Sequence, residues 1–325
     1  MQRFPLGFFP TPVQYLKNLS RKYEGQRLFI KRDDQTGLAS GGNKTRKLEY
    51  LVADALKQGC DTIITLGAQQ SNHCRQTAAA CSIAGFESHL VVRGEEPAIK
   101  QGNLLLSYLL GAKIHYAGDE ISQGFVSDVL SNLRNQNKKP YLIPYGGSNA
   151  IGILGFVDAI KELKQQITET GIEFDYIFFA SCSGGTQAGI TLGKKLHGLS
   201  AKLMPVSIQK PEGNSQDLET VVIDLCNEGS KVLNENLTFS PKDVESVKGY
   251  DEAGYGVLTD NERSAIYELA TTEGIILDPV YTARAFYAMT NLMKEGGLNE
   301  SSTILFWHTG GLPANFEYST QLLSK

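Results

Sequence analysis

The stretch SGGNKTRKLE, residues 40–49, places a lysine, Lys44, shortly after two glycines and at the start of an amphipathic helical pattern. An ammonium group at the N-terminus of a helix faces the positive end of the helix dipole, which disfavours its charged form. Burial would lower the pKa of Lys44 further, from an ordinary value of about 10.4. A neutral amine forms a Schiff base with an aldehyde. Taken alone, the stretch fits a lysine that points into water equally well.

Short apolar runs alternate with helical patterns along almost the whole chain. Strands are expected at residues 27–31, 62–66, 89–92, 113–116, 141–144, 176–180, 203–208 and 303–307. Helices are expected at residues 47–58, 72–84, 122–136, 150–165, 187–198, 260–273 and 283–294. Runs such as YIFFA at 176–180 suit parallel strands that are covered on both faces. We therefore expect an α/β fold with two doubly wound, mostly parallel sheets that share a cleft.

Two further features concern the organisation of the chain. Residues 211–251 are polar and in part irregular, so we expect surface structure there. No linker of distinct composition marks a domain boundary. The glycine-containing turns at residues 41–42 and 146–148 are the places where the chain is expected to cross between the two units.

The segment SCSGGTQAG, residues 181–189, follows a buried strand and opens a helix. Small residues let backbone amides approach an anion, and the helix N-terminus adds partial positive charge. The segment lacks both the GK[ST] ending of a P-loop and the GxGxxG dinucleotide fingerprint. Because it contains no lysine for a triphosphate, it predicts a site for a single phosphomonoester. The alternative is a tight strand–helix turn that needs small residues.

The segment GAQQSNH, residues 67–73, also joins a strand to the start of a helix. Ser71 is a candidate N-cap, and N-cap serines are common. The functional interpretation adds free amides and a hydroxyl donor that suit a carboxylate. Asn72 is placed to hydrogen-bond a phenolate oxygen.

Three more candidate functional motifs lie in the C-terminal part of the chain. They are Tyr255 between two glycines, the segment 278–282 before a helix, and the segment 307–311 after a strand. Each is weak alone, since tyrosines at loop ends often pack, and His308 suits a structural role better than that of a base. A Schiff-base lysine, a monophosphate cradle, a carboxylate site and tyrosine acids together suggest pyridoxal 5'-phosphate as cofactor.

Composition excludes several other classes of protein. The 325 residues are 41% hydrophobic and 20% charged with a formal net charge of −4, as in ordinary globular proteins. The absence of a basic tract argues against nucleic acid as a partner. Residues 1–5 lack the apolar run of a signal peptide, and no stretch approaches 18 apolar residues, so we expect no membrane span.

Cysteines and histidines point in the same direction. The five cysteines are odd in number and contain no CxxC pair, which argues against a disulfide framework or a zinc ribbon. Cys74 and Cys81 lie on one face of an expected helix, as buried thiols would. These features favour a reducing cytoplasm. The five histidines lack the spacing of metal ligands, so no metal site is expected.

With these motifs in this order, the chain resembles the fold type II (tryptophan synthase β-like) pyridoxal-phosphate enzymes. Within them it is similar to the branch of D-cysteine desulfhydrase and 1-aminocyclopropane-1-carboxylate (ACC) deaminase, over essentially its whole length. The segments that carry the resemblance are residues 31–34, 41–49, 70–72, 183–189, 255–256, 278–281 and 308–311.

The resemblance implies roles for individual residues. Lys44 would hold the cofactor and move the Cα proton, while Lys47 would be a surface residue or would lie behind the site. Tyr255 and Tyr281 would lie close to the substrate and take part in proton transfer. The cofactor would be bound by Asn43, Lys44, Asn72, Ser183, Gly184, Gly185, Thr186, Thr282 and Thr309. The substrate would be bound by Gln70, Ser71, Asn72 and His73, with Ser71 facing its carboxylate.

Two positions bear on the branch. ACC deaminases typically have glutamate directly after the tyrosine that matches Tyr281, and leucine in the motif His-Leu-Gly-Gly. Here the residues are Thr282 and Thr309, the pattern of D-cysteine desulfhydrases. A neutral hydroxyl near the pyridine nitrogen does not demand a protonated ring, and groups at this nitrogen tune the electron sink. A weaker electron sink suffices for elimination, because the β-thiol leaves as charge develops. Opening a cyclopropane ring that carries no α-proton needs a stronger electron sink.

We therefore expect α,β-elimination on D-cysteine, giving pyruvate, hydrogen sulfide and ammonia. Lys44 would remove the Cα proton, and Tyr281 or Tyr255 would protonate the sulfide. The alternatives are ACC deamination, elimination from another β-substituted amino acid such as L-cysteate, and a non-catalytic cofactor-binding protein. A nucleotide-dependent oxidoreductase is disfavoured because the dinucleotide fingerprint is missing.

The resemblance also implies a division of the chain and an oligomeric state. A large cofactor-binding domain would comprise residues 1–46 and 158–325, and a small domain residues 47–157. A homodimer is expected, with a small amino acid as the substrate.

Overall fold

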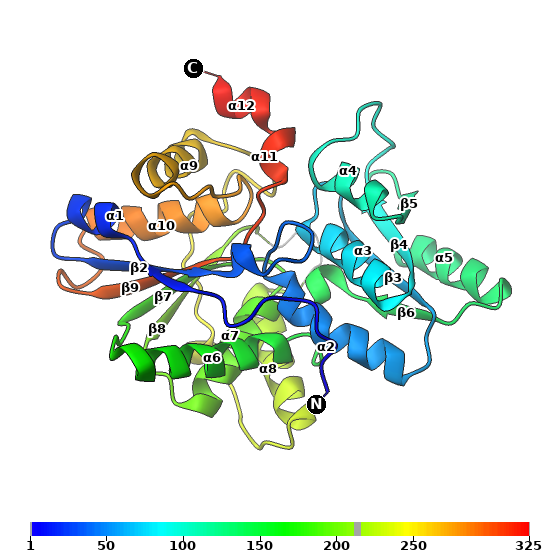
Figure 1. The fold of residues 1–325 in the computed structure, drawn as a ribbon, viewed down its shortest axis with the longest axis horizontal. Helices are drawn as coiled ribbons and strands as arrows, with labels where there is room; N and C mark the ends of the chain where they lie inside the picture. The colour runs from blue at the N-terminus through cyan, green and yellow to red at the C-terminus, as the bar shows by residue number, and fades with distance from the viewer. Residues whose placement is uncertain (1, 211–215, 325) are drawn as a thin grey trace.

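The computed structural model describes residues 2–210 and 216–324, which form two separate β-sheets with helices packed around them (Figure 1). The five-stranded sheet has the order β1-β2-β9-β7-β8 and consists of β1 (Val13–Tyr15), β2 (Arg27–Arg32), β7 (Tyr176–Ser181), β8 (Lys202–Ser207) and β9 (Thr303–His308). The four-stranded sheet has the order β5-β4-β3-β6 and consists of β3 (Thr62–Ala68), β4 (Glu87–Arg93), β5 (Lys113–Tyr116) and β6 (Pro140–Ile143).

All strand pairs are parallel except β1 with β2, so the predicted α/β fold with two mostly parallel sheets is confirmed. All eight expected strands are present. The short strand β1 was missed, because its three residues lie at the edge of the sheet without a buried apolar run.

The helices are α1 (Lys17–Lys22), α2 (Lys44–Lys57), α3 (Asn72–Ala84), α4 (Gly102–Leu109), α5 (Gln123–Asn135), α6 (Leu154–Thr170), α7 (Gly185–His197), α8 (Leu218–Val232), α9 (Asp260–Glu273), α10 (Thr282–Lys294), α11 (Ala314–Glu317) and α12 (Ser319–Leu323). The seven expected helices are confirmed. α3 and α9 have the predicted bounds, because Ser71 and Thr259 cap their first turns and Gly85 and Gly274 end them in left-handed conformations.

Residues 211–251 were expected to be surface structure that is irregular in part, and the structure shows within them one regular element with a buried face, α8. Val222, Leu225 and Cys226 give α8 a buried apolar face, and α8 packs against α7. The polar composition around this face concealed its helical spacing. Residues 211–215 of the predicted segment lie outside the described residues.

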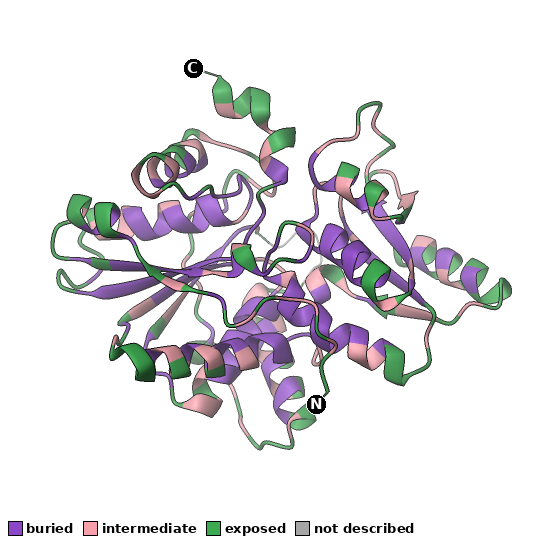
Figure 2. Ribbon diagram, viewed as in Figure 1, coloured by how far each residue is buried: buried purple, intermediate pink, exposed green. Residues whose placement is uncertain are grey.

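Both faces of the large sheet are covered, as Figure 2 shows by the buried strands at its centre. Along β7, Phe178 belongs to the core that includes Phe286 of α10. Its neighbours Ile177 and Phe179 belong to the opposite core, with Phe156 of α6. Alternate residues of β7 thus pack into hydrophobic cores on opposite faces of the sheet, as in a doubly wound fold.

Cys74 and Cys81 are buried on α3, as predicted. Among the described residues there is no disulfide, no helix long and apolar enough to cross a membrane, and no group of metal-binding side chains. The strands of residues 62–143 form one sheet and the remaining strands the other. The domain boundaries at residues 46/47 and 157/158 stay a prediction.

Candidate active site

Two glycines set the position of Lys44. Gly41 and Gly42 have φ of 72° and 129°, which other residues rarely adopt. A Cβ on Gly42 would lie 2.5 Å from the side-chain nitrogen of Gln76, so the chain passes too close to α3 for any side chain there. The turn brings Lys44 to the first position of α2.

Lys44 is largely buried, and burial lowers its pKa to about 8, while Cys182 acts in the opposite direction. The direction agrees with the expectation from the sequence. Such an amine is neutral in roughly one molecule in ten at pH 7, far more often than an ordinary lysine. Lys44 therefore has the chemical character that Schiff-base formation requires.

Arg46, two residues further on, fixes the start of α2 in the large-sheet half of the molecule. Its guanidinium donates two 2.8 Å hydrogen bonds to Asp33 and two 3.0 Å hydrogen bonds to Glu162. Lys31 also pairs with Glu162. Burial would raise the pKa of Asp33, but Arg46 outweighs it and holds that pKa below its usual value. This buried network ties β2, α2 and α6 together beneath Lys44.

Of the two positions expected for Lys47, at the surface or behind the site, the structure shows the second. Its side chain is fully buried, and Nζ donates to the Gly146 carbonyl at 3.0 Å and to Ser148 Oγ at 3.2 Å. Burial and the neighbouring Lys44 lower its pKa well below the ordinary value. The turn at residues 146–148 and the start of α7 cover Lys47, so a helix that looks amphipathic in sequence is buried at this polar position as well.

The Ser183–Thr186 loop joins β7 to α7 and receives groups from other segments. Ser148 Oγ lies 2.8 Å from Ser183 Oγ and accepts a 3.2 Å hydrogen bond from the Gly185 amide. A Cβ on Gly185 would lie 2.4 Å from Ser148 Oγ and 2.7 Å from Lys47 Nζ. Gly185 therefore leaves room for an anion against backbone amides, hydroxyls and one cation.

This cradle fits the phosphate of pyridoxal phosphate and adjoins Lys44. A Cβ added to Gly146 would lie 2.5 Å from Ser183 Oγ and 3.3 Å from Lys44 Nζ. Ser183 and Lys44 therefore both lie next to Gly146. Asn43 donates from Nδ2 to Thr186 Oγ1 at 3.1 Å, which links the residue before Lys44 to the loop. The sequence analysis gave Ser148 no role at the site and left open whether Lys47 lies at the surface or behind the site. Lys44 and Lys47 are three residues apart and therefore lie on the same face of a helix, which was a signal that both point toward the site.

The first turn of α3 supplies the other side of the site. Ser71 is its N-cap, as predicted, and accepts a 3.2 Å hydrogen bond from the Cys74 amide. Asn72 accepts a 2.9 Å hydrogen bond from Asn103. Asn72 Nδ2 lies 3.1 Å from the Cβ position of Gly311, so its donor faces the segment that follows β9.

Gln70 and His73 have other contacts. Gln70 accepts from the Asn103 amide at 2.9 Å and donates at 3.2 Å to the Gln101 carbonyl and to Glu317. His73 Nε2 lies 2.8 Å from Thr65 Oγ1 on β3. Burial and two nearby lysines hold the pKa of His73 well below its usual value, so its ring is neutral. Substrate binding by Gln70 and His73 stays a prediction.

The two predicted tyrosines meet directly. The Tyr255 and Tyr281 hydroxyl oxygens lie 2.6 Å apart, with the rings edge to face at 72°. Burial raises both pKa values above the usual one. Cys182 raises the pKa of both tyrosines and acts against the lowered pKa of Lys44. Sequence reasoning gave Cys182 no role.

Asp278 organises the start of α10. Its carboxylate accepts hydrogen bonds from the amides of Val280, Tyr281 and Thr282 at 3.0, 3.0 and 2.7 Å. It also accepts a 2.7 Å hydrogen bond from the Thr282 hydroxyl. All the hydrogen bonds that the Asp278 carboxylate accepts thus come from this turn. A Cβ on Gly311 would lie 2.7 Å from the Asp278 carboxyl carbon, so this turn and the segment after β9 are in contact.

Thr309 and His308 join the site to β9. The Thr309 carbonyl accepts a 2.9 Å hydrogen bond from the Asn43 amide, which brings Thr309 beside the turn that carries Lys44. His308 is buried, with Nε2 3.1 Å from the Ile276 carbonyl and Nδ1 accepting from the Gly310 amide at 3.2 Å. These contacts give His308 the structural role that was expected of it.

Comparison with known proteins identifies similar chains. The family model for "Pyridoxal-phosphate dependent enzyme" matches residues 5–310. A D-cysteine desulfhydrase of Klebsiella pneumoniae is 38% identical over 99% of this chain and 98% of its own length. A mitochondrial "Bifunctional D-cysteine desulfhydrase/1-aminocyclopropane-1-carboxylate deaminase" of Arabidopsis thaliana is 37% identical over 99% of this chain and 81% of its own. A solved structure of an ACC deaminase homologue superposes with a TM-score of 0.90 at 37% identity, covering 99% of this chain and 96% of its own.

Proposed function

Because the chain belongs to the pyridoxal-phosphate-dependent enzymes, we propose that it eliminates sulfide from D-cysteine to give pyruvate, hydrogen sulfide and ammonia. Its cofactor is pyridoxal 5'-phosphate. When bound, this cofactor draws electrons away from the substrate Cα, so that a proton there becomes acidic. Lys44, Asn43, Asn72 and the Ser183–Thr186 loop would hold it, with Lys47 as the cation at the phosphate.

The observation that carries the proposal is the 2.6 Å contact between the Tyr255 and Tyr281 hydroxyls. In such a pair, one phenolic proton forms the internal hydrogen bond and the other is left to donate outward. The raised pKa values keep both phenols protonated at neutral pH. The pair is therefore suited to protonate sulfide as the Cβ–S bond breaks.

Lys44 is the base in this proposal. Its pKa of about 8 leaves a usable fraction of neutral amine, which accepts the Cα proton at Nζ. The electron pair of the Cα–H bond then forms the Cα–Cβ double bond, and the thiol leaves with the Cβ–S pair. The enamine that remains is hydrolysed to pyruvate and ammonia.

The substrate carboxylate would lie at the N-terminus of α3. The Ser71 hydroxyl and the Asn72 amide group stand at this helix start, where free backbone amides and the helix dipole favour an anion. Two-point fixation of the substrate, by its amine near Lys44 and its carboxylate at Ser71, would decide which face of Cα presents its hydrogen.

Two threonines favour D-cysteine over ACC as the substrate. The Thr282 hydroxyl donates a hydrogen bond to Asp278, and the Asp278 carboxylate accepts its hydrogen bonds from the first turn of α10. The positions proposed to lie at the pyridine nitrogen, Thr282 and Thr309, therefore offer neutral hydroxyls and no free carboxylate. This arrangement supports a weaker electron sink, which suffices for elimination of a thiol.

The test is sulfide release by the cofactor-loaded protein from D-cysteine, with L-cysteine as the stereochemical control and 2-oxobutyrate release from ACC in parallel. Sulfide from D-cysteine alone supports the proposal. Turnover of ACC in preference to D-cysteine would replace it by the deaminase alternative. Turnover of L-cysteate without sulfide release from D-cysteine would show that the substrate is a β-substituted amino acid other than D-cysteine. No turnover of any of these substrates would favour the non-catalytic alternative.

Three further expectations remain part of the proposal. The large domain would comprise residues 1–46 and 158–325 and the small domain residues 47–157, with the cofactor between them. Five thiols without a disulfide among the described residues are consistent with the cytoplasm. A homodimer is proposed from the resemblance to fold type II enzymes, and its mass in solution tests it.

A further inference from the structure

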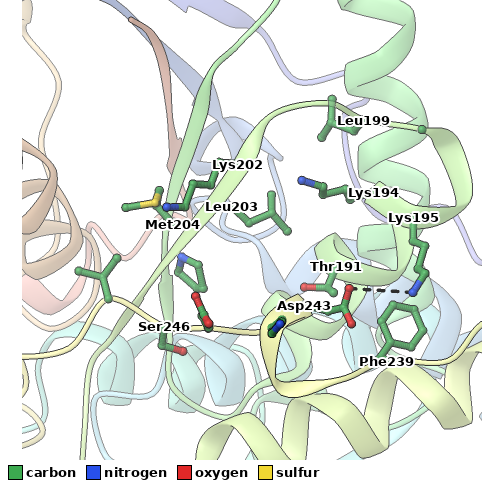
Figure 3. A pocket seen from close by; sticks show the side chains of 15 residues that line it. Thr191, Lys194, Lys195, Leu199, Lys202, Leu203, Met204, Phe239, Asp243 and Ser246 are labelled. Carbon is green, nitrogen blue, oxygen red and sulfur yellow. Dashed lines mark ion pairs between the residues drawn. The ribbon is translucent and has the colours of Figure 1, made fainter. Parts of the chain in front are cut away.

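A cavity of about 540 Å³ opens along the second half of α7, away from the cradle at its N-terminus (Figure 3). Its walls come from α7, from β8 and from the segment that follows α8. The volume lies within the range of about 300–1,000 Å³ typical of small-molecule sites. None of the residues that line it belongs to the site described above.

Positive charge dominates the lining. Four lysines line the cavity: Lys194, Lys195, Lys202 and Lys242. Two carboxylates, Asp243 and Glu245, oppose them, and Asp243 forms an ion pair of 3.9 Å with Lys195 (Figure 3). Lys194 donates a 2.6 Å hydrogen bond to the Ala201 carbonyl. This local excess stands in a chain whose formal net charge is −4. A concave site lined by one sign of charge concentrates the opposite sign. The cavity therefore selects an anion.

An apolar wall accompanies these charges. Leu199 is buried, and Leu203 and Phe239 are partly exposed beside the lysines (Figure 3). Lys195 Nζ lies 4.7 Å from the centre of the Phe239 ring and donates a 2.6 Å hydrogen bond to the Thr238 carbonyl. A ligand with an apolar or aromatic body next to its anionic group would use both surfaces.

Two hydroxyls in the lining have no hydrogen-bond partner. Thr191 Oγ1 and Ser246 Oγ are buried, and neither has a partner among the residues that the structure describes. Thr191 is only 4% exposed. A buried hydroxyl left unpaired is destabilising, so such groups in native proteins generally have a partner. A polar atom of a ligand would supply it.

We propose that this cavity binds a small phosphorylated molecule with an aromatic or apolar body, of about the size of a nucleoside monophosphate. Its phosphate would lie among the lysine ammonium groups, which bind phosphate as point charges. Its body would lie against Phe239, and a hydroxyl or ring nitrogen would pair with Thr191. This site does not depend on the proposed elimination reaction.

The test uses AMP as the probe in calorimetric titration of the cofactor-loaded protein. Cofactor loading is required because the Ser183–Thr186 cradle could otherwise bind the AMP phosphate. One AMP is expected to bind per chain, with an affinity that falls as salt rises. Adenosine, which lacks the charge, and inorganic phosphate, which lacks the body, are each expected to bind several-fold more weakly.

Thr191→Val is the decisive variant, because it removes one hydroxyl and changes little else. The native hydroxyl is unpaired, so thermal stability is expected to stay the same or rise, while AMP affinity falls about fivefold. Lys242→Gln is expected to lower AMP affinity and to weaken its salt dependence, whereas Lys57→Gln on α2 is the matched control without effect. An absence of saturable AMP binding, or equal affinity in the parent, Thr191→Val and Lys242→Gln, would overturn the site. Sulfide release plays no part in this test.

Discussion

Lys47 Nζ lies 3.2 Å from Ser148 Oγ, and Ser148 in turn accepts a hydrogen bond from the Gly185 amide at the start of α7. Three segments that are far apart in the sequence thus meet at one point. Burial lowers the pKa of Lys47 well below its ordinary value, so an anion in the cradle would favour its protonation.

Lys47→Met is therefore expected to weaken binding of pyridoxal phosphate by roughly tenfold or more, since a charge-assisted contact to the phosphate is lost. The thermal stability of the cofactor-free protein is expected to stay the same or rise, because a buried amine whose charged form is disfavoured is replaced by an apolar side chain of similar length. Cofactor titration and thermal unfolding measure the two effects. Lys57→Met, on the exposed end of α2, is the control, and equal cofactor affinity in both variants would exclude Lys47 from the cradle.

Tyr255→Phe and Tyr281→Phe are each expected to lower kcat by about 10²-fold or more, because each removes one hydroxyl of the proton-donating pair. The double variant is expected to lose much less than the product of the two single losses, since the hydroxyls act as one unit. Steady-state kinetics of the four proteins measure this coupling. Tyr267→Phe, at an exposed position on α9, serves as the control; independent effects of the two hydroxyls would contradict the pair.

Lys44 gives the cofactor uptake a defined pH dependence. Its lowered pKa means that the amine loses its proton as pH rises through about 8, rather than near 10.4 as in an ordinary lysine. Covalent uptake of pyridoxal phosphate by the cofactor-free protein is expected to become faster as pH rises and to level off above about pH 8. Stopped-flow absorbance follows the rate. A rate that still climbs steeply at pH 10 would show an unperturbed lysine.

The buried pair of Arg46 and Asp33 predicts a loss of stability. Arg46→Met is expected to lower the free energy of unfolding by about 3–5 kcal/mol, because it leaves buried carboxylates without their partner. Asp33 has a folded-state pKa below its unfolded value of about 3.9, so its contribution is complete above that value and is lost as pH falls through the folded pKa. In Arg46→Met, burial no longer has Arg46 to oppose it and raises the folded-state pKa of Asp33 above the unfolded value. The sign therefore reverses, and lowering the pH is expected to restore part of the stability that Arg46→Met loses. Urea unfolding against pH tests both effects, with Arg21→Met on the surface helix α1 as control.

Much of the fold was predictable because the strands are short runs of apolar residues and several helices, among them α3, α5 and α9, begin at a side-chain N-cap. The exceptions are elements whose burial depends on distant segments. β1 lies at a sheet edge, and α8 has a narrow apolar face within a polar region that sequence periodicity did not distinguish. Their structure is decided by packing rather than by local pattern.

The residues of the candidate site also fall into those that local sequence predicts and those whose position depends on packing. The glycine turns before Lys44 and Thr186, the N-cap Ser71 and the loop tyrosines are local features, and the structure brings them together. Lys47 could not be placed between the surface and the interior, because a lysine on an amphipathic helix is expected in water unless another segment covers it. Here the turn at residues 146–148 and the start of α7 do so. The direct contact of Tyr255 and Tyr281 likewise depends on how a loop and α10 pack.

We propose that Lys44 and the tyrosine pair together eliminate sulfide from D-cysteine. The most direct measurement is sulfide release from D-cysteine and from L-cysteine by the cofactor-loaded parent protein, with Lys44→Ala and the surface variant Lys57→Ala compared on D-cysteine. We predict release from D-cysteine only, unchanged in Lys57→Ala and absent in Lys44→Ala. Release by Lys44→Ala at a rate near that of the parent, or no release from D-cysteine by the parent, would contradict the account.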